Sequence, residues 1–75
     1  MVNKIVTYET LFKKIIVERS LSYGVVSKIT GLPRSTISNY ANGNRVPDYR
    51  TVIKLIKDLH INPELFDTLF DPVYI

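Results

Sequence analysis

Cysteine is absent from this chain of 75 residues, and histidine occurs only once, at position 60. Without cysteine the chain can form no disulfide and no thiolate metal site, and a single histidine does not make a zinc cluster. We therefore expect no metal ion and no cofactor. The lack of cysteine is also compatible with a reducing cytoplasm.

Long apolar runs are missing as well, and the N-terminal residues MVNKIVTYE lack the apolar stretch of a signal peptide. We therefore expect no membrane insertion and no export, and hence a cytoplasmic protein. With 75 residues the chain is predicted to form one domain over residues 1–75. This length lies near the lower limit for a stable core without covalent crosslinks.

The sequence shows no set of residues suited to catalysis. His60 has no serine or cysteine nucleophile in a recognisable pattern around it, and it is expected to cap the end of a helix. The acidic residues between positions 58 and 71 do not have the spacing of metal ligands. We therefore predict that the protein is not an enzyme.

What the chain does have is an uneven distribution of charge. Residues 19–57 contain seven basic residues and one acidic residue, a net charge of +6, whereas residues 58–75 carry a net charge of −4. A basic centre indicates a polyanionic partner that binds the middle of the chain. The alternative is an incidental surface pattern in a small protein.

Apolar residues recur with helical spacing along most of the chain. The first stripe consists of Tyr8, Leu11, Phe12, Ile15 and Ile16, with Thr7 as the expected N-cap. Similar stripes, with Ser22, Asp48 and Asn62 as further expected N-caps, predict an all-α fold with helices at about 7–20, 22–30, 33–42, 48–59 and 63–70. Residues 1–6 are either an ordered extension or a frayed arm.

A tight turn separates the second predicted helix from the third. The helix at 22–30 is expected to have Ser22 as its N-cap and to turn Val26 and Ile29 inward, together with Tyr23 or Val25. Gly24 lowers its helix propensity by about 1 kcal/mol relative to alanine. Gly31 stands where a left-handed residue ends a helix, and Pro33 can begin the next one. A turn this short sets two helices at a steep angle, as in a helix-turn-helix.

The run from Gly31 to Ser38, GLPRSTIS, followed by Asn42-Gly43 and Pro47, resembles the helix-turn-helix of the Cro and repressor family of phage and bacterial transcription regulators, also called the XRE family. The resemblance covers about residues 8–70. It implies a five-helix, lambda-repressor-like DNA-binding fold that binds double-stranded operator DNA as a homodimer.

Three positions depart from the family pattern. Tyr23 replaces a glutamine that contacts phosphate in relatives, and Ser27 replaces a small alanine between the two helices. Ala41 stands where a glutamate usually precedes the Asn-Gly pair. These departures leave the predicted fold intact and affect mainly one phosphate contact.

The third predicted helix has an outer face that is polar but almost uncharged. Helix propensity does not favour serine, threonine and asparagine there, so a binding role is the better explanation. A recognition helix needs short donors and acceptors on one face to reach base edges in a groove about 12 Å wide. The residues predicted to read bases are Arg34, Ser35, Ser38 and Asn39.

Phosphate contacts are predicted around this face. The N-terminus of the helix at 22–30 adds partial positive charge. The predicted contacts are Tyr23, Lys28, Thr36, Asn42, Arg45, Tyr49 and Arg50, with the roles of Tyr23 and Thr36 taken from the resemblance. Alternatively, Lys28 and Arg50 are ordinary solvated charges and Tyr49 belongs to the core.

The tail at 71–75 places three apolar residues after the last predicted helix. It either packs against the first helix or covers a partner subunit. The residues predicted to contact a second copy or another protein are Phe66, Leu69, Phe70, Val73, Tyr74 and Ile75.

These features predict a sequence-specific transcription regulator, Cro-like or a small phage or bacterial repressor, that reads operator half-sites in the major groove. Two copies on half-sites about one helical turn apart would supply the selectivity that a single small domain lacks. The alternative is a protein-binding module, such as an antirepressor, a modulator or an antitoxin, that engages another regulator or a toxin.

Overall fold

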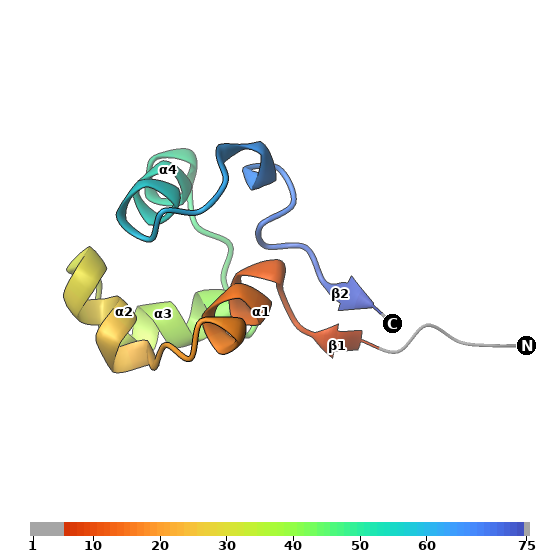
Figure 1. Cartoon of the computed structure of the whole chain (residues 1–75), viewed down its shortest axis with the longest axis horizontal. Helices are drawn as coiled ribbons and strands as arrows, with labels where there is room; N and C mark the ends of the chain where they lie inside the picture. The colour runs from red at the N-terminus through yellow and green to blue at the C-terminus, as the bar shows by residue number, and fades with distance from the viewer. Residues whose placement is uncertain (1–5, 75) are drawn as a thin grey trace, which may run out of the picture.

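The computed structural model describes residues 6–74. This part of the chain contains four α-helices, α1 (Leu11–Glu18), α2 (Tyr23–Thr30), α3 (Arg34–Ala41) and α4 (Tyr49–Asp58). A short 3₁₀ helix, η1 (Pro63–Leu65), follows α4, and two strands, β1 (Val6–Tyr8) and β2 (Val73–Tyr74), lie at the two ends of the described chain (Figure 1). The fold is therefore mostly helical, as predicted, but it has four α-helices rather than five.

The first helix starts at Leu11, and its N-cap is Thr10 rather than the predicted Thr7. Thr7 lies in β1, which pairs with β2 in an antiparallel sheet. The amide of Leu11 donates to the carbonyl of Asp71 at 2.9 Å, and the amide of Phe12 donates to the carbonyl of Leu69 at 2.8 Å. The C-terminal segment thus satisfies donors that a helix N-terminus leaves unpaired, and an earlier helical turn has no place there.

The predicted fifth helix is replaced by η1 and a series of turns. Asn62 caps η1 as expected, because its Oδ1 accepts from the amide of Glu64 at 3.0 Å. The amides of Phe66, Thr68 and Asp71 then donate to carbonyls three residues back. Bonds of this spacing form tight turns rather than an α-helix, and they redirect the chain toward β2.

The tail packs on the same chain. It was predicted either to pack against the first helix or to cover a partner subunit, and β2 lies beside β1 next to the start of α1 (Figure 1). The predicted Ile75 and residues 1–5 lie outside the described residues.

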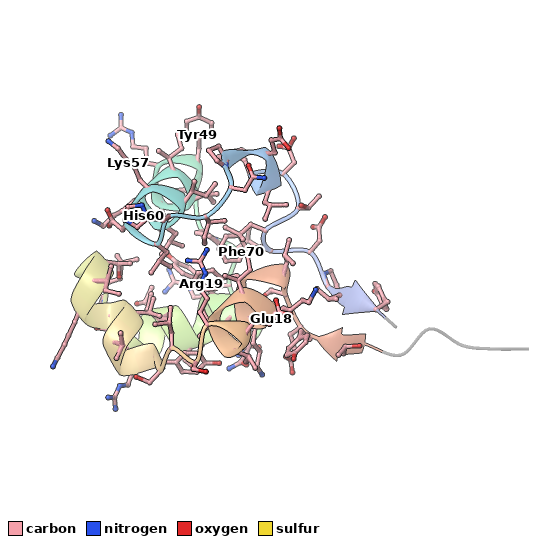
Figure 2. The ribbon with its side chains drawn as sticks, in the orientation of Figure 1. Glu18, Arg19, Tyr49, Lys57, His60 and Phe70 are labelled. Atoms are coloured by element: carbon pink, nitrogen blue, oxygen red, sulfur yellow. The ribbon has the colours of Figure 1, made fainter. Side chains whose placement is uncertain are left out.

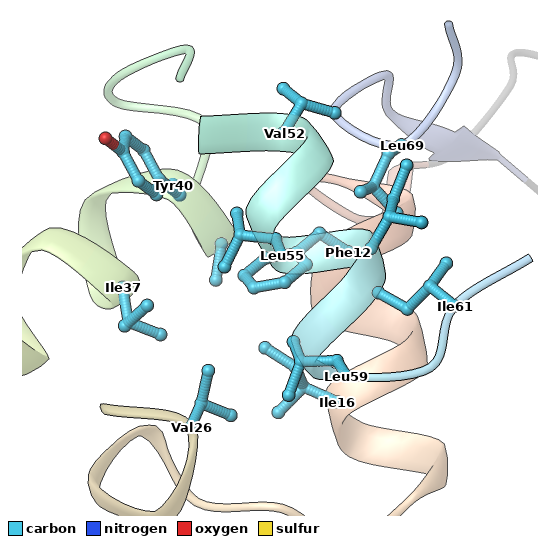
Figure 3. Packing of buried hydrophobic residues seen from close by; sticks show 12 residues of the cluster. Phe12, Ile16, Val26, Ile37, Tyr40, Val52, Leu55, Leu59, Ile61 and Leu69 are labelled. Atoms are coloured by element: carbon cyan, nitrogen blue, oxygen red, sulfur yellow. The ribbon is translucent and has the colours of Figure 1, made fainter. Parts of the chain in front are cut away.

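All four α-helices contribute to one apolar core (Figure 3). Phe12 of α1, Ile37 of α3 and Leu55 of α4 are fully buried, and Leu69 closes the core from the C-terminal turns. The expectation that Ile29 points inward is wrong, since 47% of this residue is exposed. Thr30, one position further, takes the buried place, and its hydroxyl is satisfied by donating to the carbonyl of Val26 at 2.8 Å.

The turn between α2 and α3 has the predicted geometry. Gly31 adopts a left-handed conformation with φ 75°, and its amide donates to the carbonyl of Ser27 at 2.8 Å. The Ser27 hydroxyl in turn donates to the carbonyl of Leu32 at 2.6 Å. The serine that departs from the family pattern thus holds the turn that sets the angle between the two helices.

Arg19 fastens the end of α1 to the end of α4. Figure 2 shows its side chain extending from α1 toward the turn at His60. Its guanidinium donates to the carbonyl of Leu59 and, at 3.2 Å, to the carbonyl of His60. His60 was expected to cap this helix end, but it forms the turn itself with φ 53°, and Arg19 supplies the donors.

Candidate nucleic-acid interface

The polar residues of α3 lie on the side of the helix that faces away from the core. Ile37, Tyr40 and Ala41 are buried, whereas Arg34 and Ser35 are exposed and Ser38 and Asn39 are half-buried. Since successive residues of an α-helix are separated by about 100°, the four predicted base-reading residues fall on one side. The structure therefore brings them together, on a helix whose N-terminus follows the Gly31 turn.

Arg34, the first residue of α3, lies against α2. A Cβ atom added to Gly24 would stand 2.5 Å from Nη2 of Arg34, so the guanidinium rests over the glycine. None of the ion pairs or hydrogen bonds recorded for residues 6–74 uses the Arg34 guanidinium. Its donors thus stay available for a ligand.

Ser38 belongs to a chain of side-chain contacts that runs back to α1. Its Oγ accepts from Nδ2 of Asn42 at 3.2 Å, and Oδ1 of Asn42 accepts from Nζ of Lys13 at 3.1 Å. Because an ammonium group only donates, Lys13 fixes which end of the asparagine amide faces Ser38. The Ser38 hydroxyl therefore acts as the acceptor in this contact, and its own hydrogen can be donated to a base.

Lys13 is a part of this arrangement that the sequence did not indicate. It also pairs with Glu9 at 3.0 Å, and hydrogen bonding to Lys13 is the main reason why the pKa of Glu9 lies below its ordinary value. The i,i+4 spacing of Glu9 and Lys13 was visible in the sequence. The contact with Asn42, 29 residues away, had no local signal.

Thr10 was likewise missed. Its Oγ1 accepts from the amide of Lys13 at 3.0 Å and donates to the carbonyl of Ala41 at 2.8 Å. The residue is fully buried. One side chain thus caps the N-terminus of α1 and satisfies a terminal carbonyl of α3.

The predicted phosphate contacts occupy different surroundings. Lys28, Arg45 and Arg50 are exposed, whereas Tyr23, Thr36 and Asn42 are half-buried. Arg45 lies in the loop after α3, with its guanidinium carbon 6.0 Å from the centre of the Tyr40 ring. The side chain of Asn42 is already engaged by Lys13 and Ser38, which leaves one amide hydrogen for another partner.

Tyr49 is separated from this group. Its ring stacks edge-on against Phe66 at a centroid distance of 5.1 Å, and Figure 2 shows it on the outer side of α4. Tyr49 is 67% exposed, so it is not the core residue of the alternative interpretation. The structure groups it with Phe66 rather than with the polar face of α3.

The residues predicted to contact a partner divide into two sets. Leu69 is fully buried in the core, and the ring of Phe70 packs at a tilt against that of Phe12, at a centroid distance of 5.2 Å. Assigning Leu69 to a partner surface was therefore wrong, because the chain itself covers its side chain. Phe66 and Val73 are half-buried and Tyr74 is exposed.

Within residues 6–74, no group of three or more histidine, cysteine or acidic side chains could hold a metal ion. No helix in this part of the chain is both long enough and apolar enough to span a bilayer. No pocket opens on the described surface.

Two helices joined at a glycine turn, the second with a polar outer face, define a helix-turn-helix DNA-binding domain. A helix-turn-helix family model matches residues 12–66, well over half of the chain. The protein therefore belongs to the XRE-type helix-turn-helix family of DNA-binding transcription regulators, a family that is generally not enzymatic. Neither the curated proteins nor the solved structures give a significant match to the chain.

Proposed function

We propose that this protein is a Cro-like repressor that reads operator half-sites in the major groove. The observation that carries the proposal is the outer face of α3, where Arg34, Ser35, Ser38 and Asn39 lie together. A protein-binding helix would more often present leucine, methionine or aromatic side chains there. Short polar groups and one arginine fit base edges instead.

Each reader has a role that follows from its chemistry. Arg34 can donate two hydrogen bonds to O6 and N7 of a guanine, and Asn39 can pair in the same way with N6 and N7 of an adenine. Ser38, whose oxygen accepts from Asn42, donates to a base acceptor. Ser35 contacts a base or a phosphate.

Contacts with phosphates would position α3 in the groove without reading sequence. The residues proposed for this role are Tyr23, Lys28, Thr36, Asn42, Arg45 and Arg50. Tyr49 leaves this group because its ring packs on Phe66.

A homodimer on DNA would add the second half-site. Ile53 lies one turn after Tyr49 on α4 and is 39% exposed, and the Tyr49 ring contacts the half-buried Phe66, so these side chains form an apolar strip at the edge of the core. Exposed apolar strips of this kind mark contacts between proteins. We propose this strip as one surface that joins the two copies, and Tyr74, which is exposed on β2, as a separate contact.

Selection of bound sequences from random double-stranded DNA, at two salt concentrations, tests the proposal. Arg34→Ala should lose about 1–3 kcal/mol of discrimination at one base pair of each half-site. Arg45→Ala should weaken binding to all sequences alike and reduce the dependence of affinity on salt.

Lys57→Ala is the matched control. Lys57 is an exposed basic residue on the far end of α4, so this variant loses the same charge away from α3 (Figure 2). The proposal is wrong if the selected sequence and the salt dependence are the same in all three variants and the unchanged protein.

A protein-binding function, as in an antirepressor or an antitoxin, is the second candidate. Two apolar residues of α2, Val25 and Ile29, are 42% and 47% exposed and lie one turn apart. A partner could cover them. Replacing both with serine should then abolish binding of that partner while leaving the selected DNA sequence unchanged.

A further inference from the structure

We infer that Gly24 is a positioning residue for Arg34, because its missing side chain lets the guanidinium rest on α2 in the orientation that reads a guanine. This inference rests on the proposed function. It concerns a glycine that otherwise weakens the helix in which it lies.

The backbone of Gly24 does not require a glycine. The two glycines with positive φ are Gly31 and Gly43, and Gly24 lies within the first turn of α2. Its conformation is one that alanine adopts more readily. A reason other than backbone conformation must therefore account for the missing Cβ.

The contacts supply that reason. The three atoms nearest to a Cβ built on Gly24 all belong to Arg34, with Nη2 at 2.5 Å, Cζ at 3.3 Å and Nε at 3.4 Å. The first distance is shorter than a carbon and a nitrogen can approach. Any larger residue at position 24 would occupy the place where the guanidinium now lies.

A guanidinium resting on α2 is ordered before DNA binds. A long arginine side chain otherwise samples several rotamers, and fixing it on binding weakens affinity. Contact with α2 thus restricts the conformations of the Arg34 side chain at the N-terminus of α3. The orientation of its paired donors, on which bidentate recognition of guanine depends, is set in advance.

Gly24→Ala should therefore act in opposite directions on stability and on recognition. The clash is with the far end of a flexible side chain, so Arg34 moves and the helices stay in place. Removing a glycine from a helix should raise the thermal midpoint by about 3–6 °C. Affinity for the preferred operator should fall by roughly 3- to 10-fold, with the loss confined to the base pair that Arg34 reads.

Val25→Ala is the matched control, since it places an alanine at the next position of the same helix, and Val25 is exposed. It should leave the selected sequence unchanged. In an Arg34→Ala background, Gly24→Ala should have no further effect on selectivity, because the side chain that it displaces is gone.

Three results would overturn this role. If the Gly24→Ala protein discriminates between operator sequences as well as the unchanged protein does, Arg34 does not need the space left by the missing Cβ. An equal loss with and without Arg34 shows that the glycine acts through another group, and a lowered midpoint shows that the helices themselves meet the Cβ. If Arg34→Ala leaves the selected DNA sequence unchanged, the proposed function fails as well. If Arg34→Ala changes that sequence and Gly24→Ala does not, only the role of Gly24 fails and the proposed function stands.

Discussion

Thr10→Val tests whether one buried hydroxyl joins α1 to the end of α3. Valine has nearly the same shape as threonine, so the substitution removes the hydroxyl without opening a cavity. The side chain is fully buried, and its Oγ1 makes two hydrogen bonds, to the amide of Lys13 at 3.0 Å and to the carbonyl of Ala41 at 2.8 Å. Both bonds are lost in the variant.

The size of the effect follows from these contacts. Each hydrogen bond contributes about 1 kcal/mol, and a buried carbonyl left without a donor adds to the penalty, so the free energy of unfolding should fall by about 2–4 kcal/mol. A chain of this length is expected to have about 4–11 kcal/mol in total. The thermal midpoint should therefore drop by roughly 10–30 °C.

Urea unfolding followed by circular dichroism measures this difference. Thr7→Val is the control, because Thr7 is exposed in β1 although the sequence suggested it as the cap. That variant should stay within about 0.5 kcal/mol of the unchanged protein. A loss at position 7 that equals or exceeds the loss at position 10 would refute the assignment of Thr10 as the residue that joins the two helices.

Three further outcomes are expected. Hydrogen bonds from Thr51, chiefly with its side chain, hold the pKa of Asp48 below its ordinary value, so stability should fall as pH drops below about 4; urea unfolding at low pH should show a shallower fall for Asp48→Asn. Ala41→Glu buries a carboxylate at a fully covered position and should cost about 3–5 kcal/mol in the same assay. Lys13→Met frees the amide that orients Ser38, so it should relax selectivity at one base pair while stability changes by under about 1 kcal/mol.

Much of the fold was predictable because its signals are local. Apolar spacing and a capping residue at the start of each helix located α2 and α4, whose caps Ser22 and Asp48 are those predicted. The Gly31 turn was predictable for the same reason. Only the immediate neighbours of these residues determine their conformation.

The start of α1 was predicted wrongly because it depends on distant residues. Thr7 and Thr10 can both cap a helix, and the choice is made by the segment from Leu69 to Asp71, which accepts the amides of Leu11 and Phe12. Pairing of β1 with β2 is also a contact between the two ends of the chain. No local pattern reports such contacts.

In the candidate site, too, the features set by neighbouring residues were predictable and those set by distant contacts were not. The helical period predicted that Arg34, Ser35, Ser38 and Asn39 share one face of α3. The helical spacing of residues within α3 does not show which other elements pack against this helix, so the contact of Lys13 with Asn42 was not foreseen. Gly24 was noticed only as a weakness of its helix, and its closeness to Arg34 required the packing angle of α2 on α3.

Contacts from α2 and from the N-cap of α1 stabilise the two ends of α3. Gly24 of α2 supports the guanidinium of Arg34 at the start of the helix, and Thr10 of α1 holds the carbonyl of Ala41 at its end. Since α1 itself begins on the carbonyls of Leu69 and Asp71, the C-terminal segment is connected to α3 through Thr10. A partner that rearranged this segment would therefore disturb the helix proposed to read DNA, even without touching it.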